Sequence, residues 1–231
     1  GVPPLRFAVA DAQTFTAAIR KYSSPLYGET IVTELYDEQA TTPGIEAALT
    51  KLAAQARSED TVLIYLSGHG ISDLPQVGIN RYYFVSQNVS SLPTLSREAL
   101  SENRLIELIS QIRARNSFLF LDTCHAGALT NNDAAKLGND VGRFVLAASA
   151  SVQEALDSFD GHNGIMAVAI SRGLAGDAGP DRKGFINNLN LGTYVQEEVE
   201  TMAQSKSWNQ RAVFKISSDG AQPFPLAKVG P

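Results

Sequence analysis

The chain has 231 residues, with 19 Lys and Arg against 24 Asp and Glu, and a formal net charge of -5. This acidic balance argues against a protein that binds a phosphate backbone, because such binding depends on clustered Lys and Arg. A single cysteine cannot form an internal disulfide, so we expect a reducing, cytoplasmic compartment. No apolar run is long enough for a membrane span, and we expect neither a nucleic-acid nor a membrane partner.

Hydrophobic periodicity alternates between helix and strand along the chain. In chain order we predict a helix over 11–21, a strand over 31–36, a helix that begins at Thr42-Pro43 with Thr42 as its N-cap, strands over 61–66 and 82–85, a helix over 103–112, strands over 118–121 and 144–148, helices over 165–174 and 194–202, and a last strand over 212–216. The stretch 173–190 is rich in Gly, Asp and Asn and is predicted to leave the sheet. This order predicts one α/β domain, a three-layer α/β/α sandwich whose mostly parallel central sheet has helices on both faces.

Two apolar strands end in glycine-flanked segments that carry reactive side chains. Ser67-Gly68-His69-Gly70 follows the first of them, and Asp122-Thr123-Cys124-His125-Ala126-Gly127 follows the second. Ligands of open parallel sheets bind beyond the carboxyl ends of the strands, so we expect His69 and Cys124 to meet at one rim. A thiol beside an imidazole is the pair that nucleophilic catalysis by a thiolate needs.

Each of these residues also has a simpler interpretation. A lone cysteine is often a small buried apolar side chain, and a histidine in a loop is usually solvated or hydrogen-bonded. His125 is a second candidate base, but it is the sequence neighbour of Cys124 and its side chain should point elsewhere, so we interpret it as stabilising the loop. His162 has no partner in the pattern, and we expect it to be exposed.

The segments Tyr65-Leu66-Ser67-Gly68-His69-Gly70 and Leu121-Asp122-Thr123-Cys124-His125-Ala126-Gly127 resemble the caspase-like cysteine peptidases, clan CD family C14. They are most similar to the bacterial metacaspase-like or orthocaspase branch, because Asp-Thr-Cys stands where true caspases have Gln-Ala-Cys. The resemblance covers nearly the whole chain and implies a caspase-like fold and a cysteine endopeptidase that works through a thioester acyl-enzyme. It implies Cys124 as nucleophile, His69 as general base and acid, and an oxyanion hole of the backbone N–H groups of Gly70 and Cys124.

The resemblance also implies an acidic pocket for the residue before the cut, formed by Asp11, Asp122 and Ser67. Residues i and i+2 of an extended segment share a face, so Asp122 should point the same way as Cys124. Such a pocket accepts Arg, and Lys less well, because only Arg can contact a carboxylate through two parallel hydrogen bonds. The simpler interpretations are a helix N-cap for Asp11 and a strand-end carboxylate bonded to loop amides for Asp122.

The chain departs from the resemblance at two places. Ser86-Gln87-Asn88 and Asn131 stand where many metacaspases have acidic residues that help to bind calcium. Calcium prefers several carboxylate oxygens, so we expect no cofactor and no calcium activation. The family also begins with an apolar strand before the segment that matches Leu5, which this sequence lacks. We therefore expect residues 1–231 to be one peptidase domain of a longer protein with fused or regulatory domains, or another segment to fill the gap.

The loop 131–142 has small and polar residues, contains Lys136 and precedes Arg143. Its position shortly after Cys124 makes it our candidate for self-cleavage. A catalytically idle caspase-like adaptor and an Asp-directed peptidase are the alternative functions. A nucleotide-binding domain and a serine hydrolase are not supported, because the sequence has no G-x-G-x-x-G after a strand, no Gly-Lys-Ser/Thr and no G-x-S-x-G.

Overall fold

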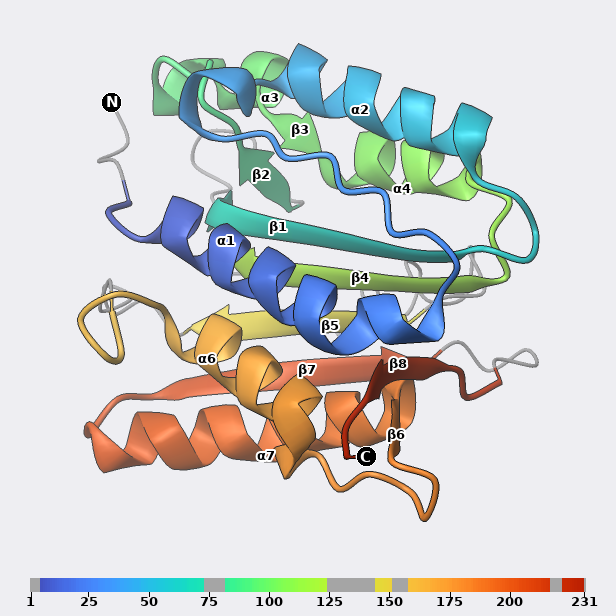
Figure 1. Cartoon of the computed structure of the whole chain (residues 1–231). Coiled ribbons are helices and arrows are strands. Elements are labelled where there is room, and N and C mark those ends of the chain that lie inside the picture. The colour runs from blue at the N-terminus through green and yellow to red at the C-terminus, as the bar shows by residue number, and fades with distance from the viewer. Residues whose placement is uncertain (1–4, 73–81, 124–143, 151–157, 217–221, 231) are drawn as a thin grey trace.

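The computed structural model describes residues 5–72, 82–123, 144–150, 158–216 and 222–230. Six strands form one mixed sheet in the order β3-β2-β1-β4-β5-β7, and β6 pairs with β8 in a small second sheet (Figure 1). In chain order the elements are α1 (Ala8–Ala18), η1 (Ile19–Ser23), η2 (Ser24–Leu26), η3 (Asp37–Gln39), α2 (Thr42–Gln55), β1 (Thr61–Ile71), β2 (Tyr83–Val85), η5 (Leu92–Thr94), α3 (Leu95–Glu98), β3 (Leu100–Ser101), α4 (Glu102–Ser110), β4 (Asn116–Thr123), β5 (Phe144–Ala150), α6 (Ile165–Arg172), η7 (Gly173–Asp177), β6 (Phe185–Asn187), α7 (Asn188–Ser205), β7 (Gln210–Ile216) and β8 (Pro225–Lys228).

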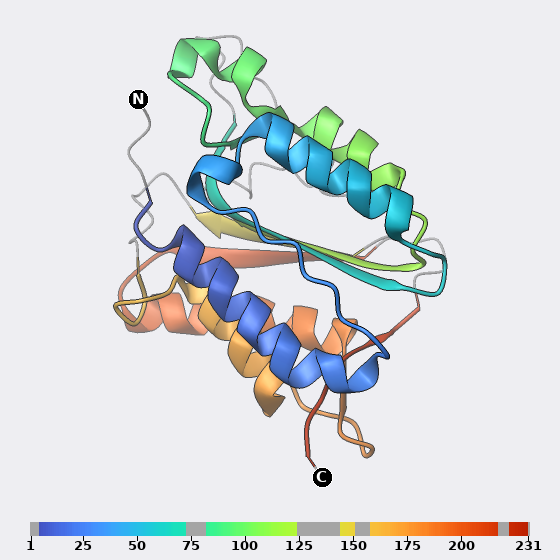
Figure 2. The same cartoon turned by 45° about the horizontal axis from the view of Figure 1, so that its top comes forward.

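Helices cover both faces of the large sheet (Figures 1 and 2). Helices α1, α6 and α7 pack on the face that holds Phe118 and Phe120 of β4. Helices α2 and α4 pack on the opposite face, where Leu119 and Leu121 point. Successive strand residues point to opposite faces, so a strand that is apolar throughout is buried on both sides. Burial of each such apolar side chain contributes about 1.5–3 kcal/mol to the stability of the fold. The layers on both faces of the sheet confirm the predicted three-layer sandwich.

The centre of the sheet is parallel. Strand β4 lies between β1 and β5 and runs parallel to both. The outer pairs β1–β2, β2–β3 and β5–β7 are antiparallel. The mostly parallel arrangement that we predicted therefore holds for the three central strands, and the sheet as a whole is mixed. Because parallel strands end at the same rim, β1 and β4 deliver the segments after their apolar runs to one place.

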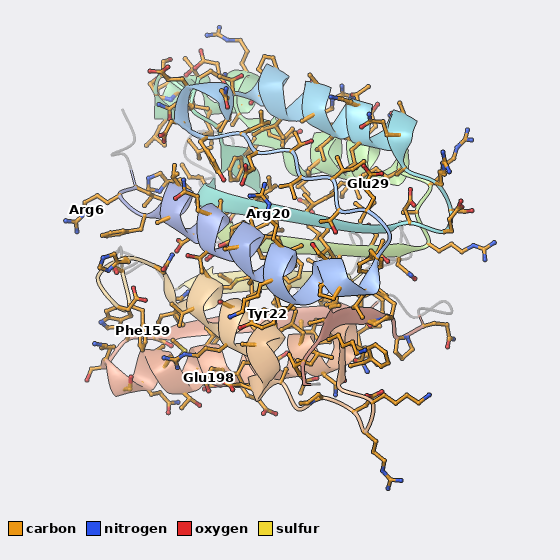
Figure 3. The ribbon with its side chains drawn as sticks, viewed as in Figure 1. Arg6, Arg20, Tyr22, Glu29, Phe159 and Glu198 are labelled. Carbon is orange, nitrogen blue, oxygen red and sulfur yellow. The ribbon has the colours of Figure 1, made fainter. Side chains whose placement is uncertain are left out.

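The predicted strand over 31–36 is wrong. These residues are an extended connection between η2 and η3 that passes between α1 and α2 in both views, and they pair with no strand among the described residues (Figures 1 and 2). Ile31 is 74% exposed, so the β-branched pattern is not buried. Arg20 points toward this connection, and its guanidinium lies 3.8 Å from the carboxylate of Glu34 (Figure 3). A strand requires a hydrogen-bonding partner as well as a suitable pattern.

Two element boundaries also differ from the prediction. Residues 67–70 were predicted as a loop, but β1 continues to Ile71 because its last residues pair with β2. Gly68 permits this close pairing, since a Cβ there would lie 2.9 Å from Cε2 of Phe84. The N-cap of α2 is Thr41 instead of Thr42, and its hydroxyl accepts a hydrogen bond of 3.1 Å from the N–H of Gly44.

The stretch after α6 leaves the large sheet, as predicted. It contains η7 and then β6, which pairs with β8 near the end of the chain. Neither of these short strands was predicted. No helix in the described ranges combines the length and apolarity needed to cross a membrane.

Candidate active site

The carboxyl ends of β1 and β4 lie side by side in a defined register. Ser67 is paired with Asp122, and Gly68 is paired with Thr123. His69 comes directly after Gly68, is half-buried, and lies opposite Val85 of β2. Cys124 comes directly after Thr123 in the sequence but lies outside the described residues, as does His125. The register thus pairs the two residues that immediately precede His69 and Cys124.

The strand beside His69 is tied to the end of β4. The hydroxyls of Tyr82, just before β2, and Thr123 share a hydrogen bond of 2.8 Å, and both side chains are buried. Gly70, the expected oxyanion donor, is buried in β1 opposite Phe84. These contacts hold β1, β2 and β4 together at the rim where the reactive segments begin.

Asp122 points to the face of the sheet that α1 covers. It lies two and four residues after Phe120 and Phe118 of the same strand and so shares their face, where the two rings lie in the core. Its Oδ2 accepts a hydrogen bond of 2.6 Å from the hydroxyl of Tyr65 on the neighbouring strand. Ser67, two residues after Tyr65, shares this face and also interacts with the Tyr65 hydroxyl. The described partner of Asp122 is therefore a side chain of β1.

Asp11 comes to the same region from α1. It lies in the first turn of that helix and is 6% exposed. Its Oδ1 accepts hydrogen bonds from the backbone N–H of Gly164 at 2.8 Å and from the side-chain amide of Asn163 at 3.1 Å. Phe7, not Asp11, occupies the N-cap position of α1, so the simpler interpretation of Asp11 as the cap of its own helix is wrong. Asp11 instead binds the N-cap residue of α6.

The turn before α6 is well braced. Oδ1 of Asp160 accepts the backbone N–H groups of His162 and Asn163 at 2.8 and 2.7 Å. Phe159 donates its N–H to the carbonyl of Asn163 at 2.6 Å, and its ring, labelled in Figure 3, packs edge-on against Trp208 at 6.5 Å. His162 is exposed, which confirms that prediction. The turn can therefore hold Asn163 and Gly164 in place against Asp11.

Burial raises the pKa of both carboxyl groups. The pKa of Asp11 rises to about 6 because burial outweighs the hydrogen bonds from Gly164 and Asn163, and the charge of Asp160 raises it further. The pKa of Asp122 rises to about 7, first through burial and then through the charge of Asp11, while the hydrogen bond from Tyr65 lowers it. A cation placed between two such carboxyl groups favours their charged forms. We call the pair Asp11 and Asp122 the anionic slot, because a positively charged group beside them would stabilise their charged forms.

Two residues that hold this slot were missed by the sequence analysis. Tyr65 stands inside an apolar strand and was counted as core, although a buried phenol usually needs a hydrogen-bond partner and Asp122 was the available acceptor. Asn163 gives no comparable signal, because its partner Asp11 lies 152 residues away in the sequence.

The segment Ser86-Gln87-Asn88, which stands where many metacaspases have calcium-binding acids, forms hydrogen bonds within the protein. Oδ1 of Asn88 accepts the backbone N–H of Thr42 at 2.7 Å and the hydroxyl of Ser86 at 3.0 Å. Within the described ranges, no group of three or more His, Cys, Asp or Glu side chains is arranged to hold a metal ion. Asn131, Lys136, Arg143 and the whole loop 131–142 lie outside the described residues.

Comparison with known proteins points to one family. The sequence model of a peptidase family described as the caspase domain matches residues 1–219. A search of curated proteins found no match. Among solved structures, the crystal structure of protein GSU0716 from Geobacter sulfurreducens is similar, with a TM-score of 0.54 and 17% identity over 91% of this chain and 84% of that chain. At this identity the likeness shows a shared fold.

Proposed function

The chain belongs to the caspase-domain family of cysteine peptidases, and on this premise we propose that it is an endopeptidase that cleaves after Arg, and less well after Lys. Cys124 is the proposed nucleophile and His69 the proposed general base and acid. The observation that carries the proposal is the register of β1 and β4, which pairs Gly68 with Thr123 directly before these two residues. Both would then stand at the rim where parallel strands present their ligands.

The proposed reaction has two halves. His69 takes the proton of the Cys124 thiol, and the thiolate attacks the carbonyl carbon of the scissile bond. The backbone N–H groups of Gly70 and Cys124 stabilise the resulting oxyanion, each donor contributing about 2.7–4 kcal/mol. The imidazolium of His69 then protonates the leaving amine, which gives a thioester. Water, deprotonated by His69, attacks the thioester, and the thiol and a carboxylic acid are released.

The anionic slot supports the preference for a basic residue. Asp122 and Asp11 line the α1 side of the sheet, and Asp122 is paired in register with Ser67, two residues before His69. A guanidinium entering the slot favours the charged forms of both carboxyl groups, whose pKa values are raised in its absence. Arg can contact one carboxylate through two parallel hydrogen bonds, and the point charge of Lys cannot. An acidic residue before the cut would meet like charge.

We further propose that activity needs no calcium, that the substrate is a protein or peptide and that the enzyme acts in the cytoplasm, with fused or regulatory domains in a longer chain. The first point draws support from Ser86-Gln87-Asn88, which carries no carboxylate and whose Asn88 is bonded to Thr42 and Ser86.

Peptides that end in Arg, Lys or Asp before a fluorogenic leaving group test the function directly. We expect release after Arg, weaker release after Lys, none after Asp, and the same rates with calcium or with a chelator. Cys124→Ala should abolish the signal, while His162→Ala, a change at an exposed histidine, should leave it unchanged. Cleavage only after Asp would refute the pocket assignment. No cleavage of any peptide, or equal rates with Cys124→Ala, would contradict the peptidase and favour the adaptor.

A further inference from the structure

The side chain of Tyr65 is held at its ring and at its hydroxyl, between α1 and the sheet. Its ring stacks on Phe15 of α1, with centroids 4.6 Å apart and planes inclined by 12°. Phe15 in turn packs against Phe120 of β4 at 5.1 Å. The hydroxyl donates to Oδ2 of Asp122 at 2.6 Å. Ring and hydroxyl are therefore both fixed, and the direction of the hydrogen bond is set by the packing of α1.

This packing links the two acidic walls of the slot. Asp11 lies four residues before Phe15 on α1, one helical turn away, so both residues lie on the same side of that helix. The ring of Phe15 rests on Tyr65, and Tyr65 binds Asp122. A single chain of contacts thus sets where the carboxylate of Asp122 stands relative to that of Asp11.

We propose that Tyr65 is a positioning residue for specificity, which anchors Oδ2 of Asp122 and leaves its carboxylate oriented to receive a guanidinium. The proposal rests on the proposed pocket, and it adds a residue that touches the carboxylate instead of the substrate. Toward Asp122 the hydroxyl is the donor, since the charged carboxylate is acceptor-only. An ordered donor on one oxygen limits the rotation of the carboxylate and holds its remaining lone pairs in one direction.

The charge balance of the pocket gives Tyr65 a second effect. Burial, followed by the charges of Asp122 and Asp11, raises the pKa of Tyr65 well above its usual value, so the phenol keeps its proton through the whole working range. The charged groups that act on Asp122 from the described elements are Asp11 on α1 and, through Asp11, Asp160 in the turn before α6. Against these the Tyr65 hydrogen bond lowers the pKa of Asp122. Loss of the hydroxyl should therefore leave the pocket protonated to higher pH.

The test is the variant Tyr65→Phe, which removes one oxygen and keeps the ring that packs on Phe15. Tyr27→Phe is the matched control, because the Tyr27 hydroxyl also donates a 2.6 Å hydrogen bond, to the carbonyl of Pro225. Binding of N-acetyl-arginine amide is measured by titration calorimetry from pH 5 to 9. The ionisation of Asp122 is followed by carbon-13 NMR of its carboxyl carbon.

We expect Tyr65→Phe to bind the arginine amide about tenfold more weakly at pH 7 and to move the Asp122 titration upward by about one pH unit, since a hydrogen bond to a charged group is of that strength. Tyr27→Phe should change neither quantity. Wild-type affinity and an unmoved titration in Tyr65→Phe would overturn the proposal. Equal losses in both variants would also overturn it, because they would show a loss of folding only. Neither readout requires peptide cleavage, so a failure of the proposed peptidase activity would be seen separately.

Discussion

The carboxylate of Asp11 accepts a 2.8 Å hydrogen bond from the backbone N–H of Gly164, a residue 153 positions further along the chain. The bond joins the first turn of α1 to the N-cap of α6, where the exposed N–H groups and the helix dipole favour a negative charge. Asn163 adds a second donor at 3.1 Å and also reaches the hydroxyl of Thr14 at 3.0 Å. The α1 wall of the slot is therefore placed by the turn that precedes α6.

Replacing Asn163 with Ala should weaken the slot. The change removes a donor that lowers the pKa of Asp11, so Asp11 would hold its proton to higher pH. We expect the KM for an Arg peptide at pH 7 to rise severalfold while kcat changes little, and the free energy of unfolding to fall by about 1–2 kcal/mol. Steady-state kinetics and urea denaturation measure the two effects.

Asn187→Ala is the control for this variant. Asn187 caps α7 by accepting the N–H of Asn190 at 2.8 Å, and its loss should cost about 1 kcal/mol of stability. Its KM should equal that of the wild type. The same KM in Asn163→Ala would show that the turn before α6 does not support the substrate slot.

The raised pKa values also predict how stability changes with pH. Asp11 and Asp122 bind protons more tightly in the folded protein than in the unfolded chain, where the pKa of an aspartate is about 3.9. Their contribution to stability is complete below about pH 4 and is lost as the pH rises through the folded values of about 6 and 7. Asp122→Asn removes one of these titrating groups, so the free energy of unfolding of the variant should fall less between pH 5 and pH 8 than that of the wild type. We expect the difference between the two falls to be on the order of 2 kcal/mol.

Urea denaturation at the two pH values measures this difference. The exposed Asp177 provides the control, since Asp177→Asn should shift the stability equally at pH 5 and pH 8. A gain for Asp122→Asn that is the same at both pH values would contradict the linkage.

The strands that are buried on both faces could be predicted from the sequence. Segments that form a strand only if a partner strand lies beside them could not. The apolar run from Phe118 to Leu121 was predicted as a buried strand, and it is buried in β4 at the centre of the sheet. The segment 31–36 is rich in β-branched residues but pairs with no described strand, and Ile31 is 74% exposed. The short strands β6 and β8 pair with each other although they are far apart in the sequence, and no local sequence pattern predicts them.

The candidate site divides in the same way. The rule for parallel sheets predicted that the segments after the apolar strands 61–66 and 118–121 lie at one rim, and the register that pairs Ser67 with Asp122 agrees with it. The sequence does not predict the continuation of β1 past Gly68, because a glycine at a strand end usually indicates a loop, whereas here it makes room for Phe84. The donors to Asp11 come from a distant turn, and only the folded chain reveals them.

The fit between Gly68 and Phe84 gives a prediction about the strand that carries His69. Gly68→Ala places a methyl group 2.9 Å from Cε2 and 3.0 Å from Cζ of Phe84, so the ring or β1 must move. Overpacking of this kind costs about 1–3 kcal/mol of stability, and we expect kcat for the Arg peptide to fall at least tenfold because His69 is the next residue. Thermal unfolding and kinetics detect the two losses.

A second substitution can restore the space. Phe84→Leu replaces the ring that meets the new methyl group with a shorter side chain. The double variant Gly68→Ala with Phe84→Leu should therefore recover part of both stability and kcat. Phe84→Leu alone should lose stability, since Phe84 is 5% exposed. Additive losses in the double variant would mean that the two residues are not coupled, contrary to their contact.

The single cysteine makes the proposed catalytic pair accessible to a simple chemical test. Iodoacetamide reacts fastest with thiolates, Cys124 is the one thiol of the chain, and the rate of alkylation follows the fraction of thiolate. If His69 stabilises the thiolate, His69→Ala should slow alkylation at pH 6.5 about tenfold or more and move its pH dependence upward. Intact-mass spectrometry counts the added groups, and His162→Ala should react as the wild type does. Equal rates of alkylation in His69→Ala and the wild type would show that His69 does not stabilise the thiolate of Cys124.

Self-cleavage in the loop 131–142 is the last expectation that can be tested on the intact chain. Lys136 is the basic residue within this loop, and Arg143 follows its end, so an enzyme that cuts after basic residues should divide the chain near these positions. We expect intact-mass analysis of the purified wild type to show fragments that together account for the whole sequence, and Cys124→Ala to remain whole. Lys136→Gln should remove or displace one cut, whereas Lys183→Gln, at an exposed lysine in the turn before β6, should leave the fragments unchanged. An active wild type with an unbroken loop would show that cleavage here is not part of activation.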